Sequence, residues 1–158
     1  MNEMLANQYF IVQRFEDAYQ EFEDVLKVHP SNSLVKKRLI LCYLYLGKVE
    51  EAFELYTEVI TSNINTIIEN EINVYDQPCK KMIHKLEHLP TDFNETDKLK
   101  ILGILWSYCN VKTSKIYFEQ LIKIIPKDKK LATILQIINH FISQSYKEKQ
   151  NGTENLFT

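Results

Sequence analysis

One pattern occurs twice in this chain, at a spacing of 34 residues. Residues 9–30 and residues 43–62 carry aromatic, small and apolar residues at the same offsets. A fixed period of this length is typical of repeat proteins, in which each unit buries its apolar face against the next one. The matched pairs are Tyr9 and Tyr43, Phe15 and Val49, Ala18 and Ala52, Phe22 and Tyr56, and Val25 and Val59.

Start and stop signals for helices lie between the apolar stretches. Pro30 ends one predicted helix, and the serines and asparagine at 31–33 offer N-caps to the next. Gly47 can end that helix because glycine adopts the left-handed conformation without penalty. The sequence has only three glycines and four prolines, which disfavours an all-β fold. We expect an all-α fold of roughly nine helices, at residues 2–12, 15–28, 33–46, 49–61, 63–74, 78–88, two between 98 and 126, and 127–146.

The repeated positions resemble the tetratricopeptide repeat (TPR) family, with repeats at about residues 1–32 and 33–64. A shortened unit at 63–88 and a further unit at 98–126 follow. The resemblance implies a right-handed α-solenoid of TPR-like helix pairs with a C-terminal capping helix. We expect this domain to cover residues 1–146, and the polar residues 147–158 to form a disordered tail.

In TPR proteins the first helix of each pair lines a concave groove, so the resemblance also predicts a binding site. Residues 39–46 are apolar all round, which is more than one buried face requires. Part of this run should stay exposed as a partner site, although the chain's own third unit could instead cover it. The expected partner-binding residues are Asn7, Phe10, Leu34, Lys37, Arg38, Leu41 and Tyr45.

One well-defined groove of the family is the carboxylate clamp, which holds the C-termini of heat-shock chaperones. Asn7 fits that pattern, but Glu3 stands where the first lysine belongs and Arg38 replaces the second asparagine. Glu3 would repel a terminal carboxylate. We do not expect a clamp.

Charge and composition favour other partners over nucleic acids and membranes. The formal net charge is −2, which provides no electrostatic footprint for either. No apolar run is long enough to span a membrane, and the N-terminus lacks signal-peptide features. The three cysteines form no CxxC pair, so we expect buried, reduced thiols. These features predict a cytoplasmic location.

One string has the form of an enzyme motif. Residues 84–88 read HKLEH, which fits the H-x-x-E-H pattern of inverted zinc proteases. Its two histidines share one helical face, but no third ligand is evident and Pro90 ends the helix. We interpret the string as the polar face of a short amphipathic helix, and we expect no catalytic activity, cofactor or metal.

The leading functional prediction is a non-enzymatic adaptor or scaffold that binds a peptide or helical segment of another protein. Small TPR proteins of this length also act as class II type III secretion chaperones, which is the first alternative. A zinc-dependent hydrolase at the HKLEH string is the second. The wide apolar arc of the last helix suggests a homodimer through that helix.

Overall fold

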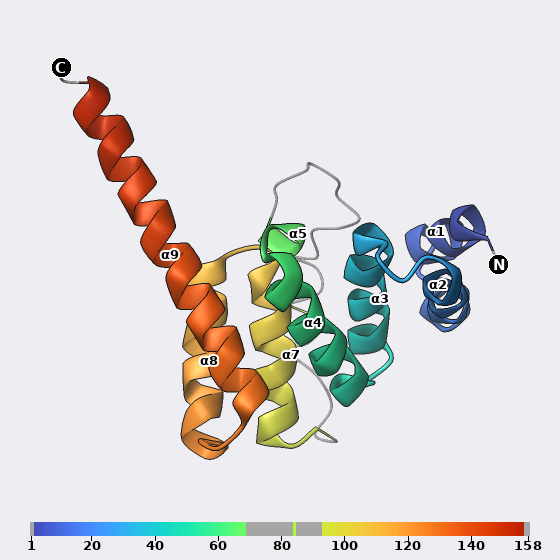
Figure 1. The fold of residues 1–158 in the computed structure, drawn as a ribbon. Helices are drawn as coiled ribbons and strands as arrows, with labels where there is room; N and C mark the ends of the chain where they lie inside the picture. Colours follow the sequence, from blue (N-terminus) through green and yellow to red (C-terminus); the bar gives the residue numbers. More distant parts are fainter. Residues whose placement is uncertain (1, 69–83, 85–92, 157–158) are drawn as a thin grey trace.

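The computed structural model describes residues 2–68, 84 and 93–156. Within these ranges the chain is helical and contains no β-strand, and the eight helices pack in adjacent pairs (Figure 1). They are α1 Glu3–Ile11, α2 Phe15–Val28, α3 Ser33–Tyr45, α4 Val49–Asn63, α5 Asn65–Ile68, α7 Glu95–Ser107, α8 Val111–Ile124 and α9 Lys129–Leu156.

Asparagine side chains begin four of these helices. Asn2, Asn32, Asn94 and Asn110 precede α1, α3, α7 and α8, and each side-chain oxygen accepts a hydrogen bond from a backbone N–H in the first turn. This contact satisfies a donor that has no partner within the helix. Asn32 is therefore the cap that the sequence predicts after Pro30.

The 34-residue offset reappears in the backbone. The turn between α1 and α2 places Gln13 at φ 64°, and the turn between α3 and α4 places Gly47 at φ 74°. Each turn closes with the same hydrogen bond, from the N–H of Arg14 to the carbonyl of Tyr9 and from the N–H of Lys48 to the carbonyl of Tyr43, both 2.8 Å. The two helix pairs therefore share one local geometry.

Small and aromatic residues of the second helices form the centre of the core. Ala18 and Ala52 are fully buried. Because their side chains are small, the paired helices can approach closely at these positions. The same pattern recurs in α8, 62 residues after the second copy, and all three of its residues are fully buried. The matched sets are Ala18, Phe22 and Val25, then Ala52, Tyr56 and Val59, then Ser114, Phe118 and Leu121.

The α7–α8 pair follows the α3–α4 pair directly in space. Helix α4 packs against α7, and the rings of Tyr56 and Phe118 lie 6.0 Å apart. The sequence predicts a further unit at 63–88 between the two pairs. Of that unit only residues 63–68 and His84 belong to the described residues, so its helices beyond α5 stay a prediction.

The last helix differs from the expectation. Helix α9 packs against both α8 and α4, and buries Leu131, Ile134 and Ile138. It continues to Leu156, where the sequence predicts a disordered tail from residue 147, and its far end projects beyond the other helices (Figure 1). Residues 143–151 contain no proline or glycine and are rich in lysine, glutamate and glutamine, which favour a helix.

Candidate functional site

The structure brings together three residues of the predicted groove. Helix α1 lies beside α3, and the guanidinium Nη1 of Arg38 donates a hydrogen bond of 2.5 Å to the side-chain oxygen of Asn7. The same guanidinium lies 5.6 Å from the ring centre of Phe10, within cation–π range. Arg38 therefore joins α1 to α3.

The sequence predicts that part of residues 39–46 stays exposed, but residues 39–44 are buried. Phe10 and Leu41 are only 5% and 1% exposed, and the charged residues Lys37 and Arg38 are buried as well. Leu34 is 43% exposed, whereas Tyr45 is partly buried and stacks on Phe15 with ring centres 4.0 Å apart. Four of the seven predicted residues are thus buried. Partner binding by the seven residues remains a prediction.

Later helices of the chain cover this face of α3. The hydroxyl of Tyr108, directly after α7, donates a hydrogen bond of 2.8 Å to the backbone carbonyl of Lys37. The Lys37 ammonium lies 5.9 Å from the centre of the Tyr108 ring. Helix α5 also packs against α3, and its Ile67 is buried. Residues 39–44 of the apolar run are buried, and the helix α3 that carries them is contacted both by α5, from the predicted third unit, and by Tyr108, from the predicted fourth unit.

The cysteines differ from the expectation of three reduced thiols. Cys42 is a free, fully buried thiol, and burial raises its pKa to about 12. Cys109 is disulfide-bonded.

The HKLEH string lies outside the described residues except for its first member. His84 is helical and exposed. Across residues 2–68, 84 and 93–156, no three histidine, cysteine, aspartate or glutamate side chains gather closely enough to hold a metal ion. The zinc hypothesis is therefore neither supported nor tested at residues 85–88.

An open groove lies between the two second helices, and we call it the α2–α4 groove. It has a volume of about 510 Å³, with its floor on α3 and its walls on α2 and α4. Its lining combines apolar residues with four glutamates and a single lysine. The lining residues are Glu23, Leu26, Lys27, Leu39, Tyr43, Glu51, Glu54, Leu55 and Glu58.

Tyr43 is the polar group on the floor of this groove. Its hydroxyl donates a hydrogen bond of 2.6 Å to the carboxylate of Glu23. Burial, this hydrogen bond and the negative charges of Glu23 and Glu51 together raise the pKa of Tyr43. The hydroxyl therefore stays protonated even in alkaline solution, where the hydroxyl of a free tyrosine ionises.

Sequence reasoning missed the α2–α4 groove because it placed the binding site on the first helices. A signal was present in α4, where Glu51, Leu55 and Glu58 recur at the spacing of one helical face. An apolar residue between two acids on the outer face of a helix could have indicated a second lined surface.

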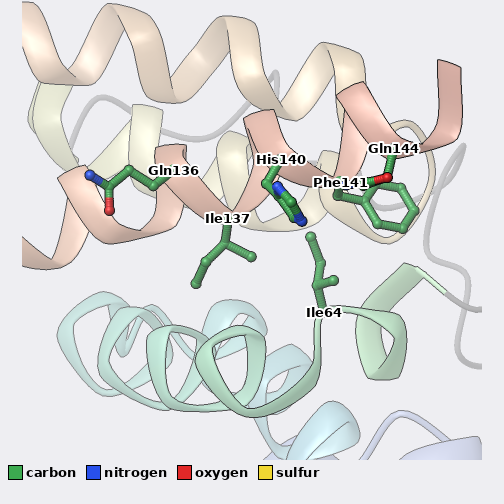
Figure 2. A pocket seen from close by; sticks show the side chains of 6 residues that line it. All are labelled: Ile64, Gln136, Ile137, His140, Phe141 and Gln144. Carbon is green, nitrogen blue, oxygen red and sulfur yellow. The ribbon is translucent and has the colours of Figure 1, made fainter. Parts of the chain in front are cut away.

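A smaller apolar pocket, the α9 pocket, lies where α9 crosses the end of α4. It has a volume of about 320 Å³. Figure 2 shows His140 of α9 pointing toward Ile64, the C-cap residue that follows α4, while Ile137 points toward α4. The remaining lining residues are Gln136, Phe141 and Gln144. Part of the wide apolar arc of α9 thus lines this pocket, and the predicted homodimer through α9 stays a prediction.

No family model, curated protein or solved structure matches this chain. In the part of the chain that the structure describes, no helix has the length and apolar character needed to cross a membrane.

Proposed function

We propose that this chain is a non-enzymatic protein-binding module, an adaptor built as a right-handed TPR-like solenoid. The observation that carries the proposal is the α2–α4 groove, an open surface with an apolar floor on a stack of helix pairs. Stacked helix pairs provide extended binding surfaces, and a groove between helices is a common site for a helical segment of another protein.

The repeated core supports the TPR-like part of the proposal. Three second helices carry a small, an aromatic and an aliphatic residue at equivalent buried positions, and two of the turns share one backbone geometry. Such repetition is a property of a modular scaffold, since each pair buries the face that its neighbour presents.

Selection from a library of displayed peptides tests the proposal while the natural partner is still unidentified. The purified chain should enrich peptides that share a pattern, and a synthetic peptide with that pattern should bind saturably with one site per chain. Isothermal titration calorimetry measures the stoichiometry. The matched control is the chain unfolded in urea, which should retain none of the selected peptides.

Two results would contradict the proposal. Enrichment of the same peptides by the unfolded chain would show that binding needs no folded groove. Failure of every selected peptide to bind in titration would remove the claim that the chain is a peptide-binding module.

A further inference from the structure

The lining of the α2–α4 groove suits one helix. Its floor is formed by Leu39 and Tyr43, one helical turn apart on α3, and Leu26 and Leu55 form the apolar parts of its walls. Two helices with an apolar floor between them offer a third helix a row of side-chain gaps, into which its own side chains can pack. An amphipathic helix is the form of peptide that such a groove accepts most readily.

The charges around the groove are strongly one-sided. The lining contains one cation, Lys27, and four acids, which are Glu23, Glu51, Glu54 and Glu58. The ammonium of Lys27 already lies 3.2 Å from the carboxylate of Asp24, which is on the same helix but does not line the groove.

The neighbouring lysines leave part of this negative charge uncompensated. Lys36 approaches the groove from α3 and pairs with Glu58 at 2.9 Å. Lys48 directs its ammonium over the ring of Tyr19, 5.1 Å from the ring centre. Among the described residues Glu51 and Glu54 form no ion pair, and both are exposed. The wall formed by α4 therefore carries two carboxylates that a bound cation could neutralise.

The spacing of these acids fits a helical partner. Glu51 and Glu54 lie three residues apart on one face of α4, which is about 4.5 Å along the helix axis. Two cations three residues apart on a partner helix would span the same distance. Apolar residues beside those cations would face Leu55, Leu26 and the floor at Tyr43.

We propose that the α2–α4 groove binds a basic amphipathic helix of a partner protein, with an apolar stripe on the floor and lysines or arginines against Glu51, Glu54 and Glu23. This inference rests on the proposed function and adds the location and the chemistry of the partner. Uncompensated acids around an apolar floor favour a cationic partner and disfavour an acidic one by like-charge repulsion.

A pair of designed peptides provides the probe. One is a helix of about four turns with leucines on one face and lysines flanking them, and the other has every lysine replaced by glutamate. A third peptide has the composition of the first in an order without a helical apolar face. Fluorescence anisotropy with each labelled peptide measures the affinity for the purified full chain.

We expect saturable binding of the leucine–lysine helix and at least about tenfold weaker binding of the other two peptides. The affinity should also fall as salt rises, because the Debye length shrinks from about 30 Å at 0.01 M to about 3 Å at 1 M. Equal binding by the glutamate peptide, or by the peptide without an apolar face, would overturn the proposed chemistry.

Two charge reversals on exposed positions locate the site. Glu51→Lys combined with Glu54→Lys should weaken binding of the leucine–lysine helix by about tenfold or more. The matched control reverses Glu119 and Glu148, two exposed acids on α8 and α9 outside the groove. It makes the same change in net charge and should alter the affinity by less than about threefold. Circular dichroism establishes that both variants keep their helix content.

The outcomes separate this inference from the proposed function. Equal weakening by both double variants would show that the peptide responds to total charge, and equal affinity in all three proteins would place its site elsewhere. Either result overturns the groove assignment, while peptides from the library could still bind. If the library selection also fails, the protein-binding function itself is refuted.

Discussion

Replacement of Gly103 by alanine tests a close approach between α7 and α8. Gly103 lies in α7, and a Cβ atom built on it would lie 2.5 Å from Cε1 and 2.7 Å from Cδ1 and Cζ of the Phe118 ring on α8. Ordinary contacts between carbon atoms are about 3.5–4.0 Å. The carbonyl of Gly103 also accepts a hydrogen bond of 2.5 Å from the hydroxyl of Ser114.

Two effects of opposite sign decide the size of the change. Alanine is better than glycine inside a helix by about 0.8–1.0 kcal/mol. Against this, Phe118 is fully buried and lies beside Tyr56, so its ring has no free space to enter. Overpacking of a tight core costs about 1–3 kcal/mol, and three contacts this short favour the upper end. We expect Gly103→Ala to lower the free energy of unfolding by about 2 kcal/mol, or about 4–8 °C in Tm.

Urea denaturation followed by circular dichroism measures the change, and the chain contains its own control. Gly152 lies in α9, and a Cβ atom there would meet nothing within 4 Å. Gly152→Ala has the same helix preference without the clash, so it should leave the stability unchanged or raise it by up to about 1 kcal/mol. Shortening the ring with Phe118→Leu should reduce the cost of Gly103→Ala, with a coupling of about 0.5–3 kcal/mol.

The reasoning fails if Gly103→Ala stabilises the protein as Gly152→Ala does. That result would mean that α7 and α8 separate or the Phe118 ring turns at little cost. A loss that Phe118→Leu does not reduce would also refute the assignment of the cost to this contact.

Gln13 and Gly47 both lie in left-handed turns, and only glycine adopts positive φ freely. We therefore expect Gln13→Gly to raise the free energy of unfolding by about 1 kcal/mol and Gly47→Ala to lower it by a similar amount. Changes of the same sign in urea denaturation would contradict this. Ala52 is fully buried, so Ala52→Leu should cost about 1–3 kcal/mol, whereas Ala132→Leu on the exposed side of α9 should cost almost nothing; an unchanged Tm for Ala52→Leu would count against the close packing of α4. Burial raises the pKa of Cys42 from 9.0 to about 12, so the unfolded chain releases the thiol proton first as the pH rises. The stability that this shift contributes is fully present below about pH 9 and is lost between about pH 9 and pH 12. Its contribution should fall by about 1.4 kcal/mol per pH unit, and the Cys42→Ala protein should therefore lose less stability between pH 9 and 11 in the same measurement.

The helix pairs were predictable because their signals are local. Caps such as Asn32, the turn at Gly47 and the small residues at 18 and 52 act within one or two turns of their own helix. The end of α9 was missed for the same reason. Its polar sequence has no apolar period, but good helix formers extend a helix that tertiary packing has already started.

The binding surface was less predictable, because exposure depends on residues far away in the sequence. Leu41 belongs to an apolar run that one helix pair alone could not bury, which made a partner site a reasonable interpretation. Tyr108 and α5 cover that side of α3, and no local pattern in α3 indicates them. The α2–α4 groove likewise requires two helices and a floor from a third.

The contacts between α3, α4 and α7 affect how the molecule unfolds. In a linear array each unit touches only the next, so the ends can open one unit at a time. Here Lys100 of α7 forms an ion pair with Glu50 of α4 at 2.9 Å, and the Tyr108 hydroxyl is hydrogen-bonded to a backbone carbonyl of α3. Helix α9 also packs against α4. We therefore expect one cooperative unfolding unit that comprises α3, α4, α7, α8 and α9. The backbone amides of α1 and α2, at the edge of the fold, should exchange with solvent first.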